Sequence, residues 1–210
     1  MGKKTTVILM CCLLLLSGCV TIVKKGEEGE LTNEATFNAG DSVEKIWESE
    51  ALPNLEEKAV NISDFLKEAN GDLNSLADAY GNYSMGTSGE LSYVIKGTFE
   101  IIEVVNDKKA GYMLVKADGY DGPLVIKIQI GSVFKGSSVR DSLDFIKFED
   151  YKNQVDYAAI SQSINDYIQK NLLDTIDLAS MQGKKIDVIG CFTVSGQEEI
   201  LIMPVEIKEK

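Results

Sequence analysis

Residues 131–167 read GSVFKGSSVRDSLDFIKFEDYKNQVDYAAISQSINDY and lie where a run of strands gives way to a long helix. Gly131 allows a close backbone approach or an unusual φ, and Gly136 repeats that freedom. The second half carries an apolar stripe at helical spacing, and we expect Asp150 or Asn153 to precede that helix. The stripe consists of Tyr157, Ile160, Ile164, Ile168 and Leu172. The stretch therefore predicts a joint between a sheet and one long helix.

The segment before this joint is rich in strand patterns. Alternating and apolar runs cover Leu91–Val105, Tyr112–Ala117 and Leu124–Ile130. Turn-forming residues separate them at Asn106–Lys109 and Asp118–Pro123. Runs of this length with short turns between them predict a three-stranded antiparallel meander.

The segment after the joint predicts a closing hairpin. Lys184–Val194 and Glu198–Ile207 flank a short turn, and Pro204 suggests an edge position because proline cannot donate to a ladder. The pattern GKKIDVIGCFT beside a β-meander predicts a small barrel of the oligosaccharide/oligonucleotide-binding (OB) kind, with about five strands and an appended helix.

The first third of the globular part predicts a helical layer. Helical patterns cover Val43–Ala51, Pro53–Ala59 and Leu73–Tyr80, with another short helix opening at Ser63. Trp47, the single tryptophan, has two interpretations: a core anchor of this layer, or a stacking platform for a sugar ring. The predicted fold class is α+β: an OB-like barrel with an N-terminal helical layer and one long helix before a C-terminal hairpin.

The start of the chain predicts export and a lipid anchor. Lys3 and Lys4 precede an apolar run of eleven residues, too short to span a membrane and typical of a signal peptide. Residues 16–19, LSGC, resemble the bacterial lipobox, which implies cleavage before Cys19 and lipidation of its sulfur. Acyl chains can then anchor the protein without a helix. We expect a signal peptide at 1–18, a flexible tether at 19–36 and one globular domain at 37–210.

Composition excludes several classes of function. The formal net charge of −12 argues against a nucleic-acid partner, which needs a basic face. The absence of histidine excludes Ser-His and Cys-His nucleophiles and the commonest zinc sites. Once Cys11 and Cys12 leave with the leader and Cys19 is lipidated, Cys191 has no disulfide partner and is expected as a buried small hydrophobe. No catalytic residue, cofactor or metal is predicted.

The acidic turn after the second strand keeps one alternative open. The carboxylates of Asp118 and Asp121 could act as hard oxygen ligands of a cation. A helical-loop calcium site also needs a bidentate Glu at its twelfth position, and that Glu is missing. Ordinary turn chemistry accounts for these residues as well. Whether they bind a cation stays undecided at the level of sequence.

Any binding surface is expected beside the 131–167 stretch. The candidate ligand- or partner-binding residues are Lys135, Arg140, Asp141, Asn153 and Gln154. Arg140 could hold a carboxylate or sugar hydroxyls with its planar fork while Asp141 orients it. Alternatively, both residues belong to a structural network that ties the glycine loop to the helix.

Several motifs together resemble one family. They are FNA at Phe37, IWES at Ile46–Ser49, LPNLEEKAVN at Leu52–Asn61, the 131–167 stretch and the closing GKKIDVIGCFTV and EEILIMPVEI. Through these motifs the chain resembles the predicted periplasmic lipoproteins grouped as a domain of unknown function (number 2291). The resemblance implies an accessory role beside sugar-import ABC transporters and their solute-binding proteins, and it implies no enzymatic activity.

Three functional hypotheses follow. The first is a non-enzymatic lipoprotein at the outer face of a membrane that binds a ligand or partner and serves a sugar-uptake system. The second is a carboxylate-based enzyme acting on envelope glycans, since paired Asp and Glu can do acid/base work without histidine. The third is a structural envelope component that associates through an exposed sheet edge.

Overall fold

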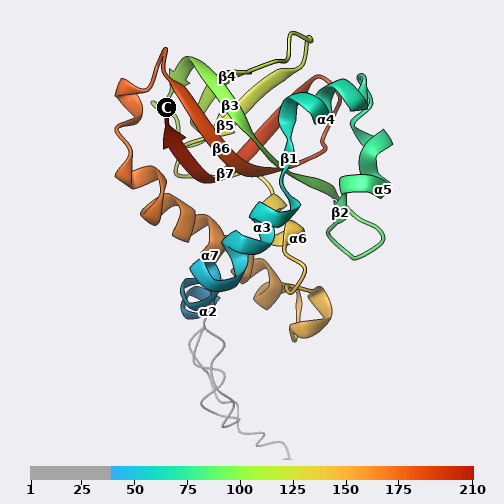
Figure 1. The fold of residues 1–210 in the computed structure, drawn as a ribbon. Helices are drawn as coiled ribbons and strands as arrows, with labels where there is room; N and C mark the ends of the chain where they lie inside the picture. Colours follow the sequence, from blue (N-terminus) through green and yellow to red (C-terminus); the bar gives the residue numbers. More distant parts are fainter. Residues whose placement is uncertain (1–38) are drawn as a thin grey trace, which may run out of the picture. The chain divides into compact units, whose positions relative to one another are not determined.

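The fold is a closed five-stranded barrel preceded by a helical layer (Figure 1). The structure is a computed structural model that describes residues 39–210. The predicted signal peptide, Cys19, the tether and the first two residues of the expected domain lie outside the described residues.

The barrel strands are β3 (Leu91–Val105), β4 (Tyr112–Ala117), β5 (Val125–Gln129), β6 (Lys185–Thr193) and β7 (Glu199–Glu209). They pair in the order β3-β4-β5-β7-β6, and β6 pairs back onto β3 to close the sheet. All of these pairs are antiparallel except β5 with β7. The predicted OB-like barrel is therefore confirmed, with the meander ends within one residue of those read from the sequence.

β3 closes the barrel because it is long enough to serve two neighbours. Its first half pairs with β6, and its second half pairs with β4. A register shift between Ile101 and Glu103 marks the bulge where the strand bends. Partial pairing also explains the position of Pro204. β5 pairs with β7 only as far as Ile202, so Pro204 pairs with β6 alone. Its missing N–H therefore costs no hydrogen bond on the β5 side, although β7 is an interior strand.

The N-terminal layer begins with α2 (Ala39–Ile46), the π-helical turn η3 (Trp47–Ala51) and α3 (Leu52–Lys58), which follow one another without a break. The sequence predicted two helices separated at Pro53. Pro53 lies in the first turn of α3, where the missing N–H is tolerated, as predicted, but the π turn joins α3 to α2 without a separation. Trp47 is buried and packs on Tyr167 with ring centroids 4.8 Å apart, which confirms it as a core anchor.

Short elements then lead into the barrel: β1 (Val60–Asn61), α4 (Ile62–Ala69), η4 (Leu73–Leu76), α5 (Ala77–Tyr80) and β2 (Asn82–Tyr83). The Asn61 side chain caps α4, and Asn70 ends it in the left-handed region at φ 45°. Both β1 and β2 pair with β3. An aromatic cluster of Phe65, Tyr93 and Phe192, with centroids 4.8–6.0 Å apart, joins α4 to the barrel.

The joint after β5 contains α6 (Ser138–Ser142) and η5 (Phe148–Asp150), followed by α7 (Gln154–Asn171), η6 (Leu173–Thr175) and η7 (Leu178–Ser180). Gly131 is required by a close approach, since a Cβ there would lie 2.1 Å from the Gly111 nitrogen. Asn153 caps α7, and the predicted stripe packs inward except for half-buried Leu172. α7 lies beside α2 at the base of the helical layer (Figure 1).

Candidate functional site

A polar cavity of about 580 Å³ lies beside the joint, and we call it the Asp141 pocket. One wall is the segment 81–86, which links α5 to the loop before β3. The other wall runs from Asp141 in α6 to Phe148 and Glu149 in η5. Tyr157 of α7 completes the lining. The pocket is therefore built by segments that are distant in sequence.

Arg140 bonds only one of the two oxygens of the Asp141 carboxylate. Arg140 donates from Nε at 2.9 Å and from Nη2 at 2.6 Å, and both bonds go to the same oxygen, Oδ1. The side chain of Asp141 is fully buried, and Oδ2 has no hydrogen-bond partner. A buried polar atom left unpaired costs about 1–3 kcal/mol. The Tyr157 hydroxyl, which also interacts with this carboxylate, is the neighbouring donor.

Burial raises the pKa of Asp141, and the Arg140 guanidinium only partly opposes this effect. The neighbouring Tyr157 also has a raised pKa, chiefly through its own burial. Its hydroxyl lies 3.5 Å from the Ser84 carbonyl oxygen, on the opposite wall. Asp141 therefore sits in a site where its charged form is poorly solvated.

Arg140 is held by the long helix. Its guanidinium lies 3.8 Å above the Tyr157 ring, a cation–π contact, and Nη1 lies 3.4 Å from the Tyr157 carbonyl oxygen. The side chain is 11% exposed. These contacts tie α6 to α7, whereas the second alternative predicted a network between the glycine loop and the helix. Of the pair, only Asp141 belongs to the pocket lining, and its side chain is fully buried.

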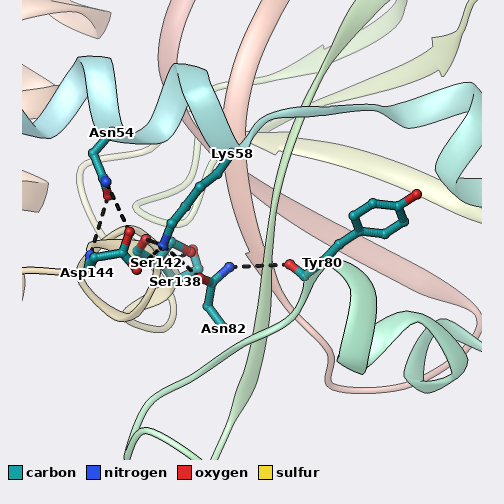
Figure 2. Close-up of polar contacts among 7 residues, drawn as sticks. All are labelled: Asn54, Lys58, Tyr80, Asn82, Ser138, Ser142 and Asp144. Carbon is teal, nitrogen blue, oxygen red and sulfur yellow. Dashed lines mark hydrogen bonds and ion pairs between the residues drawn. The ribbon is translucent and has the colours of Figure 1, made fainter.

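Lys58, at the end of α3, ties the two walls together (Figure 2). Its ammonium donates to Asn82 Oδ1 at 2.8 Å on one side, and to the Ser142 carbonyl at 2.7 Å and Asp144 Oδ1 at 2.6 Å on the other. Asn54 donates to the second oxygen of Asp144 at 3.1 Å. Partial burial alone would raise the pKa of Asp144, but the bonds from Lys58 and Asn54 outweigh it and the pKa is lowered.

The other predicted binding residues do not line this pocket. Lys135 is exposed, and its backbone N–H and carbonyl bond the Gln129 side chain. Asn153 accepts from the N–H groups of Val155 and Asp156 as the helix cap. Gln154 is the exposed first residue of α7.

Sequence reasoning missed Lys58, Asn82 and Phe148 as parts of one site. Lys58 and Phe148 belong to quoted motifs, but nothing in those motifs links the two segments. One signal was available: Phe148 is an aromatic residue in a charged, polar segment, and it proves to be 43% exposed.

A second and larger cavity, of about 810 Å³, lies at the loops of the barrel, and we call it the loop pocket. Its walls are the end of α4, the β4–β5 loop and the β6–β7 loop. Buried Leu66 and Leu73 line it together with Tyr120 and Leu124, while its charged lining residues, Lys67 and Glu198, are exposed. This cavity carries no buried charge.

The remaining sequence hypotheses concern Cys191 and the acidic turn. Cys191 is a buried free thiol, and burial raises its pKa to about 12, as expected of a small hydrophobe. Asp118 pairs with Lys185 at 3.0 Å, and Asp121 pairs with Lys116 at 2.8 Å. Within residues 39–210, no three Cys, Asp or Glu side chains gather closely enough to hold a metal ion.

The family comparison matches residues 9–208 to a family described as a predicted periplasmic lipoprotein of unknown function, number 2291. The chain belongs to this family. It is thus an exported, lipid-anchored protein of the periplasmic or extracytoplasmic face, as the sequence predicted. Among the described residues, no helix is both long and apolar enough to cross a membrane.

Comparison with solved structures supports the fold. An OB-fold protein of Thermotoga maritima is similar with a TM-score of 0.66, covering 84% of this chain and 100% of its own. The two sequences are 16% identical, so the likeness concerns the fold alone. Comparison with curated proteins finds no match.

Proposed function

We propose that this lipoprotein is a non-enzymatic binding protein, held at the membrane through a lipid on Cys19, and that the Asp141 pocket holds its ligand. The observation that carries the proposal is a cavity of about 580 Å³ whose lining combines the desolvated Asp141 with the partly exposed ring of Phe148. Small-molecule sites combine a cavity of this size with a few polar groups that fix orientation. The family resemblance extends the proposal to an accessory role in sugar uptake by an ABC transporter.

A binding screen tests this role. The full lipidated chain in detergent micelles would be titrated by calorimetry with pentoses, with hexoses and with the solute-binding protein of a sugar transporter. Binding of one of these, weakened by Asp141→Asn and unchanged by Lys135→Ala, supports the proposal. Lys135 is a suitable control because it is exposed and lies outside the pocket lining. If no sugar and no solute-binding protein binds, the sugar-uptake role is wrong.

One observation favours the second candidate, a carboxylate enzyme acting on glycans. Asp141 and Asp144 line the same pocket, and their pKa values shift in opposite directions, as in paired acids and bases. Both carboxylates are nevertheless bound by cations, Arg140 and Lys58, which leaves neither free for proton transfer. Release of sugar from peptidoglycan or chromogenic glycosides, abolished by both Asp141→Asn and Asp144→Asn, would establish this candidate over the first.

The structural alternative requires an exposed sheet edge. The edge available to it among the described strands is short, since β7 lacks a β5 partner only beyond Ile202.

A further inference from the structure

Three hydrogen bonds tie the walls of the loop pocket to one another. The Ser63 hydroxyl of α4 donates to the Asp118 carbonyl oxygen in the β4–β5 loop. The Leu73 N–H donates to the Gln197 side-chain oxygen in the β6–β7 loop at 2.8 Å. The first N–H of β5 donates to the Glu198 carbonyl oxygen at 2.9 Å. Each wall is thus fixed to a neighbour, and the cavity is formed before a ligand binds, as is usual for small-molecule sites.

The buried lining of this pocket is purely apolar. Leu66, Ala69 and Leu73 are each at most 4% exposed. Half-buried Tyr120 and Leu124 add to this surface from the β4–β5 loop. In a cavity of about 810 Å³, such a surface favours the apolar part of a drug-sized ligand, which is also the size of a short peptide.

Four exposed polar side chains surround the apolar surface: Lys67, Asn70, Gln197 and Glu198. Two of them are amides, which can both donate to and accept from a peptide group. Gln197 accepts from Leu73 with its side-chain oxygen, so its NH₂ group remains for a ligand. The polar lining therefore suits peptide groups as well as charged ones.

The two charges stand on different walls, Lys67 on α4 and Glu198 on the β6–β7 loop. Within residues 39–210, neither side chain forms an ion pair. Lys67 lies near Asp121, but Asp121 is paired with Lys116, which is the main cause of its lowered pKa. A cation and an anion on separate walls complement a ligand with opposite charges at its two ends.

We propose that the loop pocket binds a short peptide with free termini, with its carboxylate beside Lys67, its ammonium beside Glu198 and an apolar side chain on the buried leucines. This site is distinct from the Asp141 pocket and does not depend on the proposed function. It gives the larger cavity a ligand class of its own.

The test compares matched tripeptides by calorimetry, using the full lipidated chain in detergent micelles. Ala-Leu-Ala with free termini is the reference, and the others are its N-acetylated form, its C-terminal amide and Ala-Ser-Ala. We expect each change to weaken binding about threefold to tenfold, because each removes either one charge-assisted contact or the apolar one. Titration into micelles without protein gives the background.

Lys67→Met and Glu198→Gln assign the two ends of the peptide. In Lys67→Met, the free acid and its amide should bind equally, while acetylation should still weaken binding. In Glu198→Gln, acetylation should have no effect, while amidation should still weaken binding. Both side chains are exposed, so neither variant should unfold the protein.

Val125→Trp and Phe148→Ala separate the two pockets. Val125 lines the loop pocket and is 39% exposed. A larger side chain there should narrow the cavity and weaken tripeptide binding at least about tenfold. Phe148→Ala, in the lining of the Asp141 pocket, should leave tripeptide binding unchanged.

Equal binding of the free and blocked tripeptides overturns the inference, as does the absence of any tripeptide binding. Binding that depends on Phe148 but not on Lys67 or Glu198 places the peptide in the Asp141 pocket. That result overturns the inference and keeps the Asp141 pocket as a ligand site. Failure of the sugar screen, in contrast, affects only the proposed function.

Discussion

The two cavities of this protein differ in what they bury. The loop pocket is the larger, about 810 Å³ against 580 Å³, and its buried lining is aliphatic. The Asp141 pocket is smaller but contains a fully buried carboxylate whose second oxygen has no partner. Buried apolar side chains need no functional explanation, whereas a buried, half-satisfied charge costs free energy and has to be maintained. The larger cavity is therefore not the one in which a charge is desolvated.

The largest expected effect tests how much the Arg140–Asp141 ion pair contributes to the stability of the fold. Arg140→Ala leaves Asp141 buried without its cation, and breaking such a pair costs about 3–5 kcal/mol. Urea denaturation followed by circular dichroism measures the loss. Lys135→Ala, in the same segment but exposed, should change stability by less than about 0.5 kcal/mol. Equal effects of the two variants would mean that the pair contributes nothing.

The next effect concerns the loop pocket. Leu66 is 4% exposed, and Leu66→Ala should destabilise the fold by about 2–4 kcal/mol through lost burial and a widened cavity. Because no ionisable group is uncovered, the loss should be the same at pH 5 and pH 8. A pH-dependent loss would show that the loop pocket is not the purely apolar site described above.

A smaller effect tests the tie between the walls of the Asp141 pocket. Lys58→Met removes three hydrogen bonds, but Asp144 is 65% exposed and can be rehydrated, so we expect a loss of about 1–2 kcal/mol. Lys67→Met is the matched change in the loop pocket, where Lys67 is exposed, and it should cost less than about 0.5 kcal/mol. A similar loss for both lysines would remove the special role of Lys58.

The smallest effect is a pH dependence. Burial raises the pKa of Asp141 above its ordinary value of 3.8. Arg140 and Tyr157 act to lower this pKa, and the negative charge of Glu90 acts to raise it. The folded state thus binds this proton more readily than the unfolded state. The resulting stability is present below pH 3.8 and is lost as pH rises through the higher folded-state pKa.

Asp141→Asn cannot titrate, so it isolates this contribution. The stability of the native protein minus that of the variant should therefore grow as pH falls from neutrality toward 3.8. Parallel urea midpoints at several pH values provide the measurement. A difference that shrinks in acid would mean that the pKa is lowered and that the Arg140 pair dominates.

Local patterns were enough to predict most elements. The meander strands, the long helix with its cap at Asn153 and the burial of Cys191 follow from alternation, helical spacing and turn chemistry, all short-range properties of the chain. The continuity of α2, η3 and α3 across Pro53 did not follow. Proline is compatible with either an end or a first turn, and in the structure it lies in a first turn that follows the π turn directly.

The candidate site was predictable only in part. Arg140 and Asp141 are adjacent, so their pairing is a local matter, and the sequence indicated it. The contact of Arg140 with the Tyr157 ring favours the structural network over ligand binding by Arg140. Both hydrogen bonds from Arg140 end on Oδ1 of Asp141, and no local pattern predicts that geometry. Lys58 and Asn82 reach this region from other elements, at separations that no local pattern reports.

By itself, the sequence determined the lipoprotein family, most of the secondary-structure elements and the OB-like class, because motifs, periodicity and turns depend on neighbouring residues. Only the tertiary structure decided the site. Barrel closure and the packing of α3 and α7 bring Lys58, Asn82, Asp141 and Phe148 around one cavity. Burial there turns an ordinary Arg-Asp pair into a desolvated carboxylate with a raised pKa.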